Sequence, residues 1–307
     1  MSTGRADGAA WTVVVPVKSL SAAKTRLAPE HTPAERAALA RAFALDTVDA
    51  ARTARTVRRV VVVSDEPAIE RELREVPGVE VVPEVGPRGL AAAIAHGVAV
   101  ARAPDRWSGS GAASYRDPAP GDDPQDLEKS QMHGGTRHPR PLDAGAASGA
   151  GAGAGAGVGS ADVAVAVLLG DVPALRPDDL DRALQVAARH PLAFVPDAEG
   201  TGTTLATARG GEQLTAHFGQ DSAARHAAAG FADLAAAHPG AIAKGLRRDV
   251  DTAEELREAV AFGVGERTSA VLRTLPDLAE APAPRHPLDP SNSTPTAPVG
   301  VDRKAAS

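Results

Sequence analysis

Residues 163–171 read VAVAVLLGD and form a continuous apolar run that ends in an aspartate. A short run rich in valine and leucine is typical of a strand that is buried on both faces of a sheet. Three further runs have the same character, namely residues 12–17 (TVVVPV), 60–63 (VVVV) and 79–82 (VEVV). We therefore predict a sheet whose interior contains these four strands.

Helical patterns separate the predicted strands. Residues 32–35 (TPAE) form a capping box with proline at the first helical position, and an apolar stripe follows over residues 39–45. Residues 67–76 and 90–101 are also predicted to be helical. Strands that alternate with helices at short spacing indicate βαβ units. The expected fold class is α/β, with a mostly parallel central sheet flanked by helices on both faces.

Two segments interrupt this pattern. Residues 104–160 are dominated by Gly, Ala, Ser, Asp and Pro, and residues 279–307 are rich in Pro, Ser and Thr. Neither could bury enough apolar surface to offset the entropy of ordering the chain. We predict one domain over residues 11–278, interrupted by a disordered insertion at 104–160 and followed by a disordered tail at 279–307, with a flexible N-terminus at 1–10.

The composition excludes several classes of protein. The chain has no cysteine, which rules out disulfides, zinc–thiolate sites and a cysteine nucleophile. Its net charge of −6 argues against a nucleic-acid partner, whose phosphates need a concentrated basic surface. The sequence has neither the apolar core of a signal peptide nor a membrane-spanning run, so we expect a cytoplasmic protein without a membrane partner.

Basic residues follow the first predicted strand. Lys18, Lys24 and Arg26 lie in the loop PVKSLSAAKTRLAP, residues 16–29. In parallel sheets ligands bind at the carboxyl ends of the strands, where three cations could hold a triphosphate. A solvated basic loop is the alternative interpretation, and the loop lacks the glycines of a P-loop.

Acidic residues follow another strand and recur later in the chain. Asp171 ends the apolar run, where an isolated carboxylate is costly unless it is paired or bound to a metal. Asp249 and Asp251 lie two residues apart in RRDVDT, so on an extended segment both point to the same side. Together these carboxylates could bind Mg²⁺. Asp171 in a structural turn and Asp251 before a helix that starts with a Thr252–Glu255 capping box are the alternatives.

Two small polar clusters complete the set. Residues 201–204 (TGTT) and 218–222 (FGQDS) offer backbone N–H groups, hydroxyls and a helix start, which suit a phosphate or a carboxylate. Two ordinary turns and a helix cap would have the same appearance. Arg225 and His226 follow within one helical turn of Ser222, where a cation could assist anion binding or face solvent.

Seven motifs, taken together, resemble the phosphoenolpyruvate and 2-phospho-L-lactate guanylyltransferases of coenzyme F-420 biosynthesis. They occur in the family's order and approximate spacing between about Trp11 and Leu275, and they read PVKSLSAAKTRLAP, VVSDE, GPRGLAAAI, LLGDVPAL, GTGTT, HFGQDSAARH and DVDT. The resemblance implies a single nucleotidyltransferase-type, Rossmann-like α/β domain that uses GTP and Mg²⁺. Two departures are Ala91, where similar sequences often have Asn, and the insertion at 104–160.

The resemblance also implies a role for individual residues. Asp171 and Asp249 would be catalytic metal ligands with Asp251 close by, and Lys24 would act with them. The phosphorylated acid would be bound by Thr204, Gly219 and Ser222. The nucleotide would be bound by Lys18, Lys24, Arg26, Ser64, Asp65, Gly89 and Leu90.

The implied reaction transfers GMP from GTP to the phosphate of phosphoenolpyruvate and releases pyrophosphate. The product, an activated enolpyruvyl-diphospho-guanosine, would pass to the next enzyme of the coenzyme pathway. Other acceptors remain open, namely 2-phospho-L-lactate, 3-phosphoglycerate, a molybdopterin or a sugar phosphate. A nucleotide-binding module without turnover is the alternative from a different class. The oligomeric state is also open, with a homodimer as one alternative.

Overall fold

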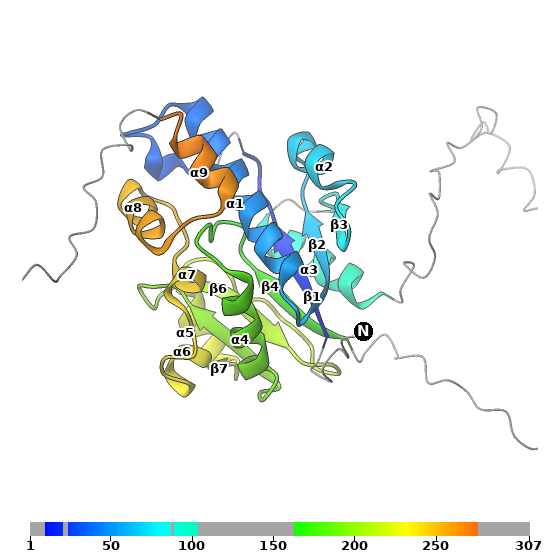
Figure 1. The fold of residues 1–307 in the computed structure, drawn as a ribbon. Helices are drawn as coiled ribbons and strands as arrows, with labels where there is room; N and C mark the ends of the chain where they lie inside the picture. The colour runs from blue at the N-terminus through cyan, green and yellow to red at the C-terminus, as the bar shows by residue number, and fades with distance from the viewer. Residues whose placement is uncertain (1–9, 21–23, 87–88, 104–162, 276–307) are drawn as a thin grey trace, which may run out of the picture. The chain divides into compact units, whose positions relative to one another are not determined.

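The computed structural model describes residues 10–20, 24–86, 89–103 and 163–275. The predicted insertion at 104–160, the predicted tail at 279–307 and residues 1–9 of the predicted N-terminus lie outside these ranges. Within them the chain alternates strands and helices, as expected (Figure 1). The elements are β1 (Trp11–Pro16), the 3₁₀ helix η1 (Thr25–Leu27), α1 (Pro33–Thr53), β2 (Val57–Val63), α2 (Pro67–Leu73), β3 (Val79–Val82), α3 (Leu90–Arg102), β4 (Ala164–Leu168), α4 (Pro177–Ala187), β5 (Leu192–Pro196), β6 (Thr203–Ala208), α5 (Ser222–Ala228), β7 (Ala232–Asp233), α6 (Leu234–Ala237), α7 (Lys244–Arg247), α8 (Ala253–Phe262) and α9 (Glu266–Leu272).

The described strands form one seven-stranded sheet in the order β3-β2-β1-β4-β6-β5-β7. β1 pairs in parallel with both β2 and β4, and β2 pairs in parallel with β3. β6 is antiparallel to both of its neighbours, β4 and β5, whereas β7 is parallel to β5. The prediction of a mostly parallel sheet is confirmed. Because β6 runs in the opposite direction, its amino-terminal end lies at the carboxyl edge of the parallel strands.

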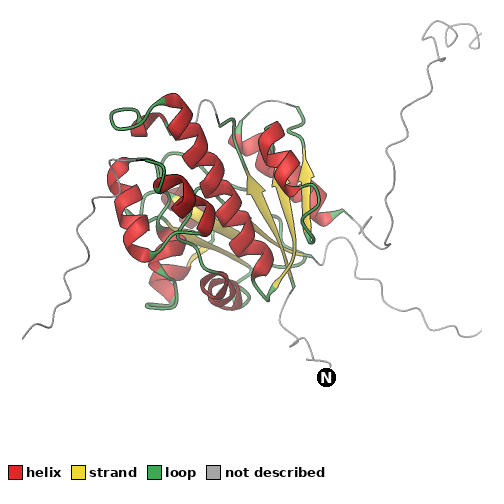
Figure 2. Ribbon diagram, turned by 45° about the horizontal axis from the view of Figure 1, so that its top comes forward, coloured by secondary structure: helices red, strands yellow, loops and turns green. Residues whose placement is uncertain are grey.

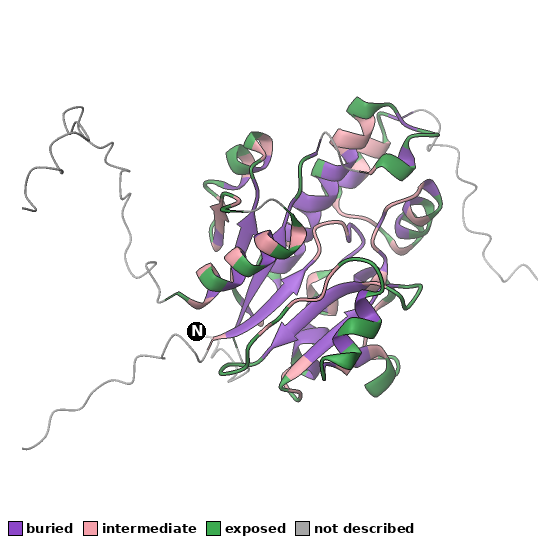
Figure 3. Cartoon of the chain, turned by 180° about the vertical axis from the view of Figure 1, so that it is seen from behind, coloured by how far each residue is buried: buried purple, intermediate pink, exposed green. Residues whose placement is uncertain are grey.

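Helices cover both faces of the sheet, which explains why the central strands have no polar face. On one face α1 and α4 pack on alternate residues of β1, β2 and β4, such as Val13, Val60 and Ala166. On the other face α3 packs on the intervening residues, such as Val14 and Val61. Figures 1 and 2 show the long α1 on one side of the strands, and Figure 3 shows the central strands buried while the helices are exposed on one side.

A further layer of helices packs against the outer side of α1. Phe43 and Leu39 of α1 form a separate apolar cluster with Leu256 of α8 and with Val250. The carboxylate of Asp46 accepts hydrogen bonds from the backbone N–H groups of Arg267 (3.1 Å) and Thr268 (2.8 Å), at the start of α9. These donors have no partner within their own helix, so Asp46 satisfies them from the neighbouring helix.

The local signals in the sequence predicted the helix starts better than the element ends. Both capping boxes are confirmed, with Thr32 and Glu35 starting α1 and Thr252 and Glu255 starting α8. β2 begins at Val57 rather than at residue 60, and α2 ends at Leu73 rather than at residue 76. Within the described ranges, no helix combines the length and apolar character that a bilayer span requires.

Gly97 lets α3 approach the sheet closely, which generates a stability prediction. A Cβ at this position would overlap the side chains of Val14 and Val63. Alanine favours a helix by about 1 kcal/mol over glycine, whereas overpacking a core costs about 1–3 kcal/mol. We expect Gly97→Ala to lower the free energy of unfolding by up to about 2 kcal/mol in chemical denaturation. Ala95 lies on the exposed side of α3, so Ala95→Gly measures the effect of helix propensity on stability without a change in core packing. Stabilisation by Gly97→Ala would contradict the packing argument.

Candidate active site

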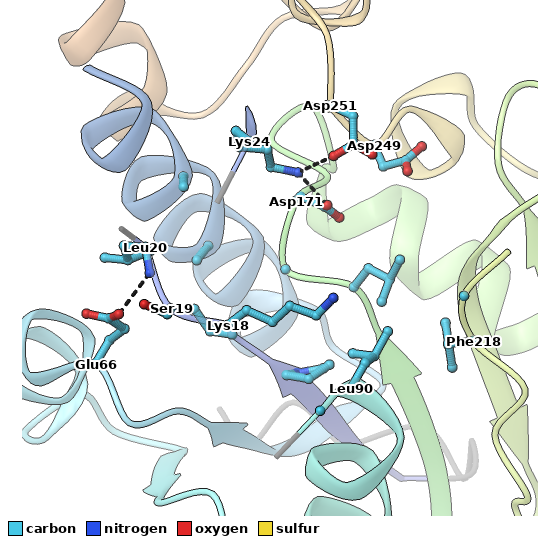
Figure 4. Close-up of a pocket in the computed structure, with 18 of the residues that line it drawn as sticks. Lys18, Ser19, Leu20, Lys24, Glu66, Leu90, Asp171, Phe218, Asp249 and Asp251 are labelled. Atoms are coloured by element: carbon cyan, nitrogen blue, oxygen red, sulfur yellow. Dashed lines mark hydrogen bonds and ion pairs between the residues drawn. The ribbon is translucent and has the colours of Figure 1, made fainter. Parts of the chain in front are cut away.

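One large cavity opens at the carboxyl edge of the parallel strands (Figure 4). Its volume is about 840 Å³, which lies in the range of small-molecule sites. Each of the seven motifs quoted from the sequence contributes at least one residue to its lining. Examples from the seven motifs, in chain order, are Lys18, Asp65, Leu90, Asp171, Gly202, Ser222 and Asp249.

Lys24 connects three distant parts of the chain inside this cavity. Its Nζ donates hydrogen bonds to Asp171 Oδ2 (2.6 Å) and Asp251 Oδ1 (2.9 Å), and its side chain is only 8% exposed. Burial alone would lower the pKa of Lys24, but the two carboxylates outweigh burial and hold the pKa above its usual range. Lys24 also has a left-handed backbone with φ of 57°. Non-glycine residues rarely adopt this conformation, and it concentrates at functional sites.

The cavity holds more negative charge than Lys24 can neutralise. Burial, together with the charges of Asp171, Asp251 and Asp197, raises the pKa of Asp249 to about 7. Burial also works to raise the pKa of Asp251, but Lys24, Arg26 and Lys18 outweigh it and keep that pKa below its usual value. The buried Oδ1 of Asp171 has no hydrogen-bond partner among the described residues. Clustered carboxylates with a spare oxygen are the donor set that a hard divalent cation binds.

The structure adds two acidic residues that the sequence reasoning missed, Asp197 and Glu199. Carboxylate oxygens of Asp197, Glu199 and Asp249 lie within 4.8 Å of one another. Asp249 therefore belongs both to the predicted set with Asp171 and Asp251 and to this second group. Asp197 follows β5 directly, so applying the strand-end rule to residues 194–197 (FVPD) would have found it.

Asp197 also shapes the loop that precedes β6. Its carboxylate accepts hydrogen bonds from the backbone N–H groups of Thr201 (2.9 Å) and Gly202 (2.6 Å). A Cβ at Gly202 would overlap this carboxylate, so the close approach requires glycine. The TGTT cluster is thus a carboxylate-bound turn that leads into a strand.

The predicted nucleoside residues come from the turn after β2 and the start of α3. Asp65, Gly89 and Leu90 line it. Ser64 is buried, and its Oγ accepts a hydrogen bond from the Glu66 backbone N–H (3.2 Å), so it fixes the turn. Glu66 and Glu84, which sequence reasoning missed, line the cavity as well.

Carboxylates also hold the backbone around the predicted nucleoside residues in place. Glu66 Oε1 accepts a hydrogen bond from the Leu20 backbone N–H (2.8 Å), and Asp65 Oδ1 accepts one from the Glu84 backbone N–H (2.9 Å). The loop after β1 and the segment after β3 are therefore both tied to the turn after β2.

The basic residues of the first loop differ in position. Lys18 lines the cavity, and Figure 4 shows its side chain extended between the group around Lys24 and the side chain of Leu90. The side chain of Arg26 is 74% exposed, and its Nη1 lies 3.9 Å from Asp251 Oδ2. Among the residues that the structure describes, Lys18 and Lys24 are thus the cations that line the cavity, while Arg26 lies on its solvent side.

Of the three residues predicted to bind the acid, two line the cavity, and Thr204 is not among its lining residues. Gly219 and Ser222 line the cavity, as does Thr203, the residue before Thr204. The pairing of β5 with β6 shifts register at this point, which is how a bulge re-aims side chains. The Oγ1 of Thr204 is buried and has no hydrogen-bond partner among the described residues. Gly219 has φ of 111°, a conformation that favours glycine.

The helix start after this cluster differs from the expected cap, and the expectation for His226 was wrong. Asp221 has a left-handed backbone with φ of 53°, and its side chain makes no capping hydrogen bond. His226 neither offers a cation nor faces solvent. It is fully buried, and burial lowers its pKa to about 4, so it is neutral at physiological pH.

A mostly parallel α/β sheet with lysines and aspartates gathered at its carboxyl edge fits an α/β nucleotidyltransferase. A family model described as "Guanylyl transferase CofC like" matches residues 11–105. The phosphoenolpyruvate guanylyltransferase of Sanguibacter keddieii is 43% identical over 292 residues, which cover 85% of this chain and 84% of that protein. The chain therefore belongs to the phosphoenolpyruvate guanylyltransferase family, as the sequence motifs predicted.

Two further relatives have the same name. The phosphoenolpyruvate guanylyltransferase of Streptomyces coelicolor is 38% identical over 265 residues, 86% of this chain and 97% of that protein. That of Thermomonospora curvata is 39% identical over 266 residues, 87% of this chain and 90% of that protein. Among solved structures, a putative nucleotide-diphospho-sugar transferase from Desulfovibrio desulfuricans G20 aligns with 14% sequence identity and a TM-score of 0.45. The alignment covers 83% of this chain and 96% of that chain.

The crowding of carboxylates predicts a pH-dependent gain in stability for Asp249→Asn. The usual pKa of 3.8 rises to about 7 on folding, so the native protein holds the proton more tightly than the unfolded chain. That stabilisation is complete below about pH 4 and is lost as the pH rises through 7. Each pKa unit corresponds to about 1.4 kcal/mol, so Asn should stabilise the metal-free protein by up to about 4 kcal/mol at pH 8.

Urea denaturation of the variant and of the wild type, in buffer that contains a chelator, measures this difference in the free energy of unfolding at pH 4, 6 and 8. The gain over wild type should grow with pH and should shrink when Mg²⁺ is added to the wild type. Asp178→Asn, whose side chain is 77% exposed, is the matched control and should change stability by less than about 0.5 kcal/mol at each pH. A gain for Asp249→Asn that does not depend on pH would contradict the electrostatic explanation.

Proposed function

We propose that this chain transfers GMP from GTP to the phosphate of phosphoenolpyruvate and releases pyrophosphate. The observation that supports this most directly is the convergence of all seven family motifs on one cavity. Identity of 43% to a phosphoenolpyruvate guanylyltransferase over most of the chain supports the same substrates. The product is an enolpyruvyl-diphospho-guanosine, an activated acid suited to transfer in coenzyme F-420 biosynthesis.

The reaction is an in-line displacement at the α-phosphorus of GTP. A phosphate oxygen of phosphoenolpyruvate forms the new P–O bond while the bond to the β-phosphate breaks, and pyrophosphate carries away the electron pair. The attacking phosphate is ionised at neutral pH, so no general base is needed. Positioning the two anions and neutralising their charge are therefore the tasks of the protein.

Lys18 and Lys24 supply the fixed positive charge. Both lie inside the cavity, and the carboxylates around Lys24 keep it protonated. Two anions repel each other as they approach, and pre-positioned ammonium groups reduce this repulsion without reorganisation. Arg26, on the solvent side of the cavity, would contact the outer phosphates.

Asp171, Asp249 and Asp251 would hold Mg²⁺, which would supply further charge neutralisation at the reacting phosphates. The spare Oδ1 of Asp171 and the raised pKa of Asp249 support this assignment. Lys24 pairs with Oδ2 of Asp171 and leaves Oδ1 without a partner among the described residues, while burial and the neighbouring carboxylates oppose the charged form of Asp249, whose pKa they raise. Asp197 and Glu199 extend the acidic group on the side away from Lys24.

The remaining assignments divide the cavity between the two substrates. The acid would lie against Thr204, Gly219 and Ser222, next to the carboxylates. The guanosine would lie against Asp65, Gly89 and Leu90, on the turn that Ser64 fixes. The basic loop lies between the two groups and would face the triphosphate.

The reaction class is tested by pyrophosphate release from the purified chain with GTP and Mg²⁺. We expect release that depends on phosphoenolpyruvate and is far slower with 2-phospho-L-lactate, 3-phosphoglycerate or no acid, and slower again with ATP in place of GTP. Release without any acid would instead indicate a GTP pyrophosphohydrolase. If a protein shown to bind GTP releases no pyrophosphate with any of these acids, the result would favour a different acceptor or a binding module.

Substitution of one metal-binding carboxylate tests the mechanism. Asp171→Asn keeps the side-chain volume but removes the negative charge next to Lys24, and we expect kcat to fall about 100-fold or more. Circular dichroism should show an unchanged fold. Asp178→Asn, on the exposed first turn of α4, is the control and should retain wild-type turnover. Retained activity in Asp171→Asn would remove Asp171 from the catalytic group.

A further inference from the structure

His226 takes part in four of the five contacts between aromatic rings that the described residues make. The chain has five phenylalanines, and three of them surround this imidazole. Phe194 stacks on the ring at 5.6 Å, while Phe218 (5.3 Å) and Phe231 (5.0 Å) meet it edge-on. Such a site would suit an apolar ring, so a histidine there needs a reason.

The hydrogen bonds of the ring define its tautomer. Nδ1 lies 2.9 Å from the carbonyl oxygen of Ser222 and 3.1 Å from Oγ1 of Thr203. Nε2 lies 3.1 Å from the backbone nitrogen of His217, which donates to it. A carbonyl oxygen only accepts and a backbone N–H only donates, so Nδ1 carries the proton and Nε2 does not. Burial, which lowers the pKa of His226 to about 4, is consistent with this neutral form.

The three partners belong to the three segments that carry the proposed acid-binding residues. Thr203 precedes Thr204 at the start of β6, His217 precedes the Phe218–Gly219 turn, and Ser222 begins α5. The start of β6 is separate in the sequence from the other two segments, which adjoin each other at residues 217–222, and all of them come together around one ring. Further backbone hydrogen bonds join them, from Ala223 N to Thr201 O (3.1 Å) and from Ser222 N to Gly219 O (3.1 Å).

We propose that His226 is the positioning residue of the acceptor site, holding Thr203, the Gly219 turn and Ser222 in the arrangement that binds the phosphorylated acid. The proposal rests on the proposed function and deepens it. His226 does not touch the substrate and transfers no proton. It orients the hydroxyl and backbone N–H groups of the site, and the surrounding phenylalanines keep water away from its hydrogen bonds.

Steady-state kinetics of three variants test this role. His226→Phe fills the volume but removes the hydrogen bonds of both ring nitrogens. We expect the KM for phosphoenolpyruvate to rise about tenfold or more. The KM for GTP should change less than about twofold. His226→Asn keeps a donor near the Nδ1 position and His226→Gln an acceptor near the Nε2 position, so each should recover part of the loss.

Phe231→Leu is the matched control, because it loosens the same aromatic group without removing a hydrogen bond. Its KM for phosphoenolpyruvate should stay within about twofold of wild type. An equal rise in Phe231→Leu and His226→Phe would overturn the proposal in favour of a packing role, as would unchanged acceptor KM in the Asn and Gln variants and in a folded Phe variant. If His226→Phe does not fold, the Asn and Gln variants decide.

The wild-type assay separates this proposal from the proposed function. If the wild-type chain releases no pyrophosphate with phosphoenolpyruvate, the proposed function fails and this inference fails with it. If the wild type turns over normally and the His226 variants bind phosphoenolpyruvate as tightly as wild type in calorimetry, the function stands and only the role of His226 is overturned.

Discussion

The parallel pairing of β1 with β4 determines where the charged groups of the site lie. Val13 and Val14 of β1 are in register with Ala166 and Val167 of β4, so the two strands end side by side. The basic loop that follows β1 and the Asp171 turn that follows β4 must then meet at the same edge. The strands are buried on both faces, which leaves the loops at their ends as the place for polar groups.

A single buried ammonium group then organises the charges at that edge. Lys24 is paired with two carboxylates from parts of the chain that are 147 and 227 residues away in sequence. Lys24 alone cannot balance Asp171, Asp249 and Asp251, and burial together with the neighbouring carboxylates raises the pKa of Asp249. Such an imbalance is unfavourable in a protein without its ligand. It is therefore better understood as preparation for a cation and for phosphate groups than as a source of stability.

The sequence predicted the features that depend on local patterns. Apolar runs identified the central strands, capping boxes identified two helix starts, and residues just beyond strand ends identified Lys18, Asp171 and the Ser64–Asp65 turn. The antiparallel strand β6 was missed because its residues, TTLATA, follow glycines and resemble a turn. The burial of His226 depends on Phe194 of β5, which is distant in sequence, as well as on the nearby Phe218 and Phe231. No spacing rule in one sequence reveals such a contact.

The segment between α3 and β4 leaves and rejoins the described fold at the edge of the sheet opposite the cavity. Val100, near the end of α3, accepts a hydrogen bond from Arg59 near the start of β2, and Ala164 pairs with Trp11 at the start of β1. Chain length at this place is therefore independent of the geometry of the catalytic edge. A reporter or an affinity handle inserted there would join the described fold away from the cavity. The same position would also divide the chain into two fragments for a complementation assay.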